Sequence, residues 1–328
     1  MRTRHIATIA ALALVAAACG GGDDGSSASN GDDSSGTIFV SGSSTVEPIS
    51  ALNAEKFKTD NPNVSITVEG PGTGDGFKKF CAGESDVSDA SRPIKDSEAE
   101  DCATNGVEYV ELQVAVDGLS VVTSTANTAV SCLTFHDLYA LVGPESIGFD
   151  KWADANDLAA ELGGTSGPYP DANLVVTAPG EESGTYDTFV ELVIEDLAEQ
   201  RDQFPASRPD YQASANDNVI IEGISGSDTS LGWVGYAFYI ENTDQVKALA
   251  VDDGQSGCVT PSAETIADGS YPLARPLYIY VNTTKAEEKA ELASFVDFYL
   301  GDGLASVGET GYVELDDYSA VLDAWANR

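Results

Sequence analysis

The chain has few positively charged side chains. It contains 16 Lys and Arg against 54 Asp and Glu, which gives a formal net charge of −38. A surface of this charge repels the phosphate backbone of nucleic acids and the headgroups of anionic membranes. The composition therefore argues against nucleic acid as a partner, and nothing in it indicates more than a monomer.

Histidine is also scarce: the chain has two, and His136 is the only one after residue 19. A hydrolytic serine needs a neighbouring base or metal to activate it, and His136 falls inside a predicted helix. Since Cys-x-x-Cys spacing is lacking too, the sequence predicts no metal site, no cofactor and no enzymatic activity. A surface phosphatase is the weaker alternative, with Ser44, Ser91 or Ser183 as its nucleophile.

Long hydrophobic runs are lacking at the N-terminus. The apolar run at residues 6–18 is too short to span a bilayer, and Arg2 and Arg4 precede it as in a secretory signal. Three alanines lead into Cys19, which is typical of a lipoprotein signal covering residues 1–19. We expect Cys19 to carry a lipid that holds the protein at the outer face of a bacterial cell membrane. An ordinary secretory signal is the alternative.

The segment at residues 20–36 consists of Gly, Ser, Asp and a few other small or polar residues, so it predicts a flexible linker. About 290 residues follow, enough to bury a substantial core in two lobes.

The folded part also contains four of the five cysteines. An even number of cysteines outside the cytoplasm indicates two disulfides, with three pairings open. We favour Cys81–Cys102, which brackets one local helix and loop, and Cys132–Cys258, which closes the other lobe.

Strand-like and helix-like segments alternate along this part, which predicts an α/β fold with mixed, mostly parallel sheets. Strand candidates at 107–112 and 119–123 flank a Val-Asp-Gly segment, where we expect the chain to cross into a second lobe. A strong strand at 277–281 brings it back. The predicted lobes are residues 37–118 with 278–328, and residues 119–277. Their two crossings form a hinge, and the cleft between them is the expected ligand site.

Three short turns rich in Gly, Ser and Thr carry the functional signal: residues 41–45, 70–76 and 183–185. Each follows a predicted strand and opens a predicted helix. The start of a helix offers unpaired N–H groups and the positive end of the helix dipole. Three such starts that converge would bind a small oxyanion without help from net charge. A hydroxyl at such a position is otherwise an ordinary helix cap.

These turns belong to a longer pattern. The first and third turns, taken with five further segments and with their order and spacing, resemble the PstS family, the phosphate-binding component of a phosphate ABC transporter. The segments that carry the resemblance are 41–49, 89–94, 116–118, 179–185, 215–218, 231–236 and 270–276. The resemblance spans essentially the whole folded part. It implies a two-lobed type II periplasmic binding protein fold that captures inorganic phosphate and delivers it to a membrane permease.

The resemblance also implies which residues bind phosphate. The family's donors fall on Ser44, Thr45, Thr73, Ser91, Arg92, Ser183, Gly184 and Thr185. The chain has Pro179-Gly180 where one branch of the family has an arginine, which leaves Arg92 as the expected cation.

Phosphate keeps a proton near neutral pH, whereas sulfate does not, so a buried carboxylate facing the ligand would favour phosphate. Asp117 is our first choice for this acceptor, with Asp75 and Asp89 behind it. A turn aspartate that bonds its own backbone is the other interpretation of Asp117. Binding of another oxyanion, sulfate or molybdate, by the same fold is the alternative function.

Overall fold

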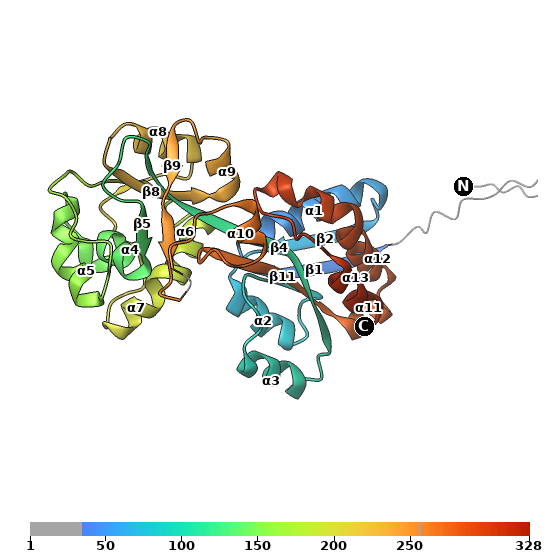
Figure 1. Cartoon of the computed structure of the whole chain (residues 1–328). Coiled ribbons are helices and arrows are strands. Elements are labelled where there is room, and N and C mark those ends of the chain that lie inside the picture. Colours follow the sequence, from blue (N-terminus) through green and yellow to red (C-terminus); the bar gives the residue numbers. More distant parts are fainter. Residues whose placement is uncertain (1–34, 256) are drawn as a thin grey trace, which may run out of the picture. The chain divides into compact units, whose positions relative to one another are not determined.

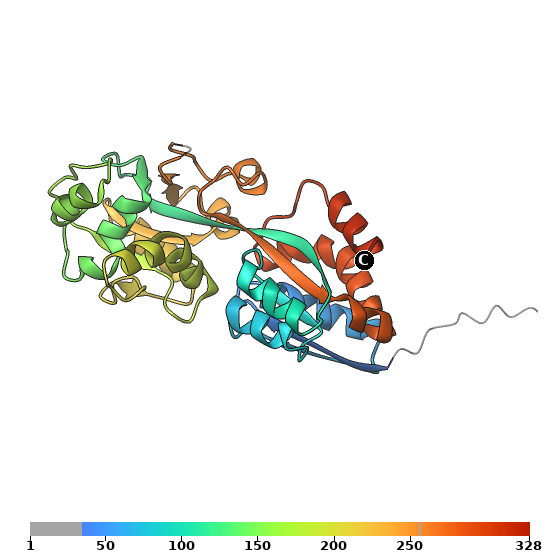
Figure 2. The same ribbon diagram turned by 90° about the horizontal axis from the view of Figure 1, so that it is seen from below.

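The centre of the fold is a long strand, β4 (Tyr109–Ser124), that takes part in both halves of a nine-stranded mixed sheet. The computed structural model describes residues 35–255 and 257–328 (Figure 1). Strand β11 (Ala274–Asn282) pairs with β4 in antiparallel fashion along most of its length. Figures 1 and 2 both show these two strands side by side, linking the two ends of the sheet.

The strands follow the order β2-β1-β3-β11-β4-β8-β6-β7, and β9 also pairs with β4. Parallel pairs lie at the two ends of this order, and antiparallel pairs surround β4 and β11. Strands β10 and β5 form a separate parallel pair. The remaining strands are β1 (Gly36–Gly42), β2 (Val64–Glu69), β3 (Val87–Ala90), β5 (Cys132–Thr134), β6 (Val175–Ala178), β7 (Gln212–Ala213), β8 (Ser230–Gly235), β9 (Val246–Ala248) and β10 (Ala250–Asp252).

Helices follow most of the strands, as the sequence predicts. They are α1 (Glu47–Asp60), α2 (Thr73–Cys81), α3 (Asp96–Thr104), α4 (Phe135–Val142), α5 (Asn156–Leu162), α6 (Gly184–Phe189), α7 (Glu195–Gln200), α8 (Asp217–Ser225), α9 (Tyr236–Ile240), α10 (Ala263–Ala267), α11 (Thr283–Glu288), α12 (Ala290–Phe298) and α13 (Ser319–Ala326). A π-helical segment, Val190–Ile194, joins α6 to α7. Another, Tyr299–Gly303, follows α12, and 3-10 turns lie at Pro144–Ser146, Trp152–Ala155 and Leu304–Thr310. Within the described residues, no helix combines the length and apolar character needed to cross a bilayer.

The buried apolar side chains form two main clusters that divide the chain near the crossings. One cluster draws on residues 38–115 and 277–325, and the other on residues 116–273. Strand β4 contributes buried side chains to both clusters, and β11 contributes them to the first, with the partly buried Ala274 packed against the second. The lobe boundaries predicted at 118 and 277 stay a proposal, which this distribution of buried side chains supports.

The predicted interruption between 107–112 and 119–123 is wrong, because β4 continues through it without a break. An Asp-Gly pair favours a turn locally, but here long-range pairing decides the conformation. Asp117 and Gly118 lie opposite Arg275 and Ala274 of β11, and Val116 exchanges backbone hydrogen bonds with Val313. A side chain at Gly118 would begin 2.6 Å from Ile266, so glycine here permits close packing.

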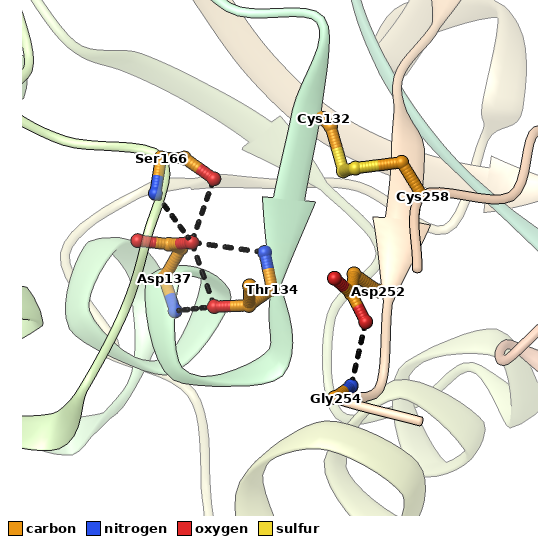
Figure 3. Close-up of a disulfide and its surroundings, with 7 residues drawn as sticks. All are labelled: Cys132, Thr134, Asp137, Ser166, Asp252, Gly254 and Cys258. Atoms are coloured by element: carbon orange, nitrogen blue, oxygen red, sulfur yellow. Dashed lines mark hydrogen bonds between the residues drawn. A yellow bond between two sulfur atoms is a disulfide. The ribbon is translucent and has the colours of Figure 1, made fainter. Parts of the chain in front are cut away.

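Both predicted disulfides are confirmed. Cys81–Cys102 joins α2 to α3, and Cys132–Cys258 joins β5 to the segment after β10 (Figure 3). Their sequence separations are 21 and 126 residues. In the chain-entropy description, loops of these lengths stabilise the fold by about 3 and about 5 kcal/mol.

Next to the second disulfide, a fully buried carboxylate fixes the start of α4. Asp137 accepts hydrogen bonds from the backbone and hydroxyl groups of Thr134 and Ser166 (Figure 3) and from the Tyr169 hydroxyl. Burial alone would raise the pKa of Asp137, but these hydrogen bonds outweigh it and hold the pKa below its usual value. The carboxylate is satisfied internally, so its role is structural.

Candidate functional site

The first Ser/Thr turn lies between β1 and α1. It is held against β3 by a hydrogen bond from the Ser43 amide to the Asp89 carbonyl, 2.8 Å long. Gly42 makes this approach possible, since a Cβ atom there would begin 2.0 Å from the same carbonyl oxygen. Ser44 is partly exposed and Thr45 is buried. The turn therefore presents its hydroxyls from a fixed backbone.

The second turn contacts the first through a hydrogen bond from the Gly72 amide to the Gly42 carbonyl, 2.8 Å long. Thr73 then begins α2, and its hydroxyl lies 3.0 Å from the Ser91 hydroxyl at the end of β3. The Ser91 amide also donates to Thr73 Oγ1 at 3.2 Å. Three predicted ligand segments are thus joined by direct bonds.

The third turn meets the first from the other side. Ser183 caps α6 by accepting a hydrogen bond from the Thr185 amide at 3.2 Å. A Cβ atom on Gly184 would lie 3.7 Å from Thr45 Oγ1, so the two turns are in close contact. Further along the helix, the Ser44 hydroxyl donates to Asp187 at 3.4 Å.

Two cavities lie at this junction. Seven of the nine predicted ligands line one or the other, and Ser183 and Gly184 line neither. The first, which we call the turn cavity, has a volume of about 370 Å³. It is lined by Ser43, Ser44, Thr45, Gly72, Thr73, Gly74, Ser91, Arg92, Lys95, Asp187, Glu191, Glu195 and Arg275. The second cavity, of about 360 Å³, includes Asp117 and Thr185 among its lining residues. Ser44, Thr45, Thr73, Ser91 and Arg92 therefore share one space, whereas Asp117 and Thr185 face its neighbour.

Arg275 connects the two groups, and our sequence interpretation missed it. Its side chain is 5% exposed. It donates from Nε to Asp117 at 3.3 Å and from Nη2 to Thr45 at 2.8 Å. It also donates to Thr188 and Glu191 of the helix that follows the third turn. One signal was available: cations are few in this chain, and Arg275 lies in the 270–276 segment that carries the family resemblance.

Arg92, the expected cation, lines the turn cavity with its side chain 22% exposed. It forms two hydrogen bonds to Glu98, both 2.8 Å long, and its guanidinium carbon lies 5.6 Å from the centre of the Phe77 ring. Burial acts to raise the pKa of Glu98, but hydrogen bonds from Arg92 and from the Lys95 amide lower it overall. Arg92 is thus held in place by an ionised partner.

The three candidate carboxylates lie in different surroundings. Asp117 is buried and bonded to Arg275 and to the Thr188 hydroxyl, which donates at 3.0 Å. Asp75 is exposed and pairs with Lys78, so it does not face the turn cavity. Asp89 lies in the core, where its Oδ1 accepts from Ser50 at 2.8 Å. Among the described residues, its Oδ2 has no hydrogen-bond partner.

Other carboxylates line the turn cavity instead. Asp187, Glu191 and Glu195 project from the continuous helical run that begins at the third turn. Burial is the main cause that raises the pKa values of Asp187 and Glu195, and the nearby Glu191 adds to it in both. Within the part of the chain that the structure describes, His, Cys, Asp and Glu side chains do not cluster in a way that could hold a metal ion.

This arrangement, with a cavity where two crossing strands join two clusters of core residues, defines an α/β solute-binding protein. Comparison with known proteins agrees: the PBP superfamily domain matches residues 27–302. The crystal structure of "a possible phosphate binding protein" from Planctomyces limnophilus superposes with a TM-score of 0.81 at 38% identity, covering 90% of this chain and 99% of that one.

Two curated relatives indicate which family within the superfamily the chain belongs to. Protein SphX from Synechococcus elongatus is 39% identical over 279 residues, which are 85% of this chain and 77% of that protein. The phosphate-binding protein PstS from Staphylococcus saprophyticus is 34% identical over 282 residues, 85% of this chain and 81% of that protein. The chain belongs to the PBP superfamily and, within it, to the PstS family of substrate-binding proteins. The predicted family and its periplasmic binding protein fold are thereby confirmed.

The position of Asp89 leads to a prediction on pH and stability. Burial raises its pKa to about 7, against the opposing effect of the Ser50 hydrogen bond. The unfolded chain loses this proton near pH 3.8, so the folded state binds more protons between the two values and stability falls as pH rises. Relative to Asp89→Asn, we expect the unfolding free energy of the unmodified protein to fall by about 2 kcal/mol from pH 5 to pH 7.

Urea denaturation of both proteins at pH 5, 6 and 7 measures this difference. Asp60→Asn, which changes an exposed aspartate at the end of α1, serves as the matched control and should follow the unmodified protein. If the unfolding free energies of Asp89→Asn and the unmodified protein change equally with pH, Asp89 is already ionised at pH 5.

Proposed function

We propose that this protein captures inorganic phosphate in the turn cavity and delivers it to the permease of an ABC importer. The observation that carries the proposal is the convergence of hydroxyl-rich turns on one cavity beside a buried arginine. Helix α2 begins at its wall with Thr73, α1 begins two residues after the lining residue Thr45, and Gly184 at the start of α6 contacts Thr45. Helix starts and hydroxyl donors suit a tetrahedral oxyanion, and they add no positive charge to an acidic protein.

The relatives support phosphate as the ligand, because a protein named for phosphate binding is 34% identical over most of this chain. The ligands we propose are Ser44, Thr45, Thr73, Ser91, Arg92, Ser183, Gly184 and Thr185, with Asp117 as the acceptor of the phosphate proton. Thr185 and Asp117 face the second cavity. Phosphate contact with both groups therefore requires the anion to sit where the two cavities meet, next to Arg275.

The crossing strands supply the proposed hinge between residues 37–118 with 278–328 and residues 119–277. The pairing of β11 with β4 shifts its register between Leu277 and Tyr278. Such an irregularity concentrates a change of backbone angle at one point of a strand pair. Rotation about it would open the contact between Thr45 and Gly184 and admit the ligand.

The proposed location is the outer face of the cell membrane, where a lipid on Cys19 anchors the protein. Cys19 lies outside the described residues, as does the linker up to residue 34, so this part of the proposal rests on the sequence pattern. A tethered monomer beside its permease needs no membrane-spanning segment of its own.

Ligand choice gives the second prediction. In calorimetry, phosphate should bind the purified protein, and sulfate at the same concentration should leave that binding nearly unchanged. The reason is that a buried carboxylate pairs with the proton of phosphate and repels sulfate, which has none. Equal competition by sulfate would favour a general oxyanion-binding protein, and a lack of phosphate binding would contradict the proposed function.

Loss of one donor gives the third prediction. Removing one hydrogen bond to a buried charged ligand costs about 1.5–3 kcal/mol, so Thr185→Val and Arg92→Ala should each weaken phosphate binding by that amount. Thr59→Val, which changes an exposed threonine of α1, is the control and should bind as the unmodified protein does. Unchanged affinity in both site variants would remove Thr185 and Arg92 from the site.

The anchor gives the fourth prediction. When the full chain is produced in a bacterial host, the unmodified protein should sediment with membranes, and Cys19→Ala should leave the membrane fraction. The physical reason is that an acyl chain contributes about 0.8 kcal/mol of membrane affinity per buried CH₂ group. Fractionation followed by mass measurement of the mature N-terminus tests this, and equal sedimentation of both proteins would argue against a lipid on Cys19.

A further inference from the structure

Arg275 is a buried cation with almost all of its hydrogen-bonding capacity in use. A guanidinium has five N–H groups. Nε donates to Asp117, Nη2 donates to Thr45 and Thr188, and Nη1 donates to Glu191. Within the described residues this engages four of the five hydrogens. The remaining one lies on Nη1, the nitrogen that contacts Glu191.

The two carboxylates on Arg275 differ in exposure. The Asp117 side chain is 9% exposed, and it also accepts the Thr188 hydrogen bond at 3.0 Å. The Glu191 side chain is 37% exposed and lines the turn cavity. Asp117 is thus held by two bonds on the side of the second cavity, whereas Glu191 lies on the side of the turn cavity and has solvent to move into.

The charges of the turn cavity leave little room for an added anion. Its lining includes three cations, Arg92, Lys95 and Arg275, and three carboxylates, Asp187, Glu191 and Glu195. Arg92 is already paired with Glu98 through two hydrogen bonds. Lys95 is exposed, so water screens its charge. An entering dianion therefore gains most from a buried cation whose present partner can leave, and Arg275 with Glu191 meets that condition.

We propose that the Glu191 carboxylate occupies, on Nη1 of Arg275, the position that the bound oxyanion takes, so that Glu191 and the ligand compete for this arginine. The inference rests on the proposed function and deepens it. It makes Arg275 a further ligand-binding cation and Glu191 the residue that tunes its affinity.

This exchange has two physical consequences. First, Arg275 is paired in both the empty and the occupied site, which avoids the large cost of an unpaired buried charge. Second, a dianion gains more from Arg275 than the single charge of Glu191 does, whereas a monoanion gains nothing from the exchange. Glu191 therefore disfavours small monoanions and lowers the affinity for the proper ligand, which makes release easier.

Phosphate titrations of three proteins by calorimetry test the proposal. In Glu191→Gln the competitor loses its charge but keeps its shape, so we expect phosphate to bind roughly tenfold more tightly than to the unmodified protein. Glu195→Gln removes the same charge from the same helical run, and Glu195 also lines the turn cavity. It makes no bond to Arg275 among those described, so we expect a smaller gain of about twofold from the weaker negative field alone.

The outcomes are distinct. A large gain confined to Glu191→Gln supports the competition. Equal gains in both variants would overturn the competition, because the loss of one negative charge would explain both. Unchanged or weaker binding in Glu191→Gln would overturn it too, while phosphate binding by the unmodified protein still stands. If the unmodified protein binds no phosphate at any concentration, the proposed function and this inference both fall.

Discussion

The buried guanidinium of Arg275 is the contact on which the site depends. It touches the first turn through Thr45, the crossing strand through Asp117, and the helix after the third turn through Thr188 and Glu191. These segments lie far apart in the sequence, and the register of β11 against β4 brings them to one point. Burying a cation is expensive unless ionised and polar partners surround it, so the same bonds that hold the arginine also hold the walls of the cavity in place.

That constraint explains how the proposed anion site can exist in a chain with a net charge of −38. Charges on the surface are screened over roughly 8–10 Å at physiological salt, whereas groups in a buried cavity are screened much less. The affinity for an anion therefore depends on the charges near the cavity. The residues that line the turn cavity include as many cations as carboxylates, so their net charge is close to zero. Uncharged hydrogen-bond donors are added by the hydroxyl groups of Ser44, Thr45, Thr73 and Ser91, which leave this net charge unchanged.

The sequence was sufficient where the signal is local. Gly, Ser and Thr after a strand predict the turns at 41–45 and 183–185, and the spacing of Cys81 and Cys102 predicts a bridge within one helix and loop. The sequence was not sufficient where strand pairing between distant segments determines the contacts and the backbone conformation. Asp117 was chosen as a buried acid, but its arginine partner lies 158 residues away and depends on strand register. The same pairing keeps Asp117 and Gly118 in β4, against the local preference of an Asp-Gly pair for a turn.

Asp89 shows why a carboxylate near an anion site need not oppose it. Its backbone carbonyl anchors the first turn through Ser43, while its side chain points into the core against Ser50. Burial raises the pKa of this side chain to about 7, so near neutral pH a substantial fraction carries no charge. An ionised aspartate behind the Ser43–Thr45 turn would oppose an anion held by that turn, because Asp89 is buried and the protein interior screens its charge only weakly. The Asp89 backbone can therefore hold the first turn, while burial of the Asp89 side chain limits the negative potential behind the cavity.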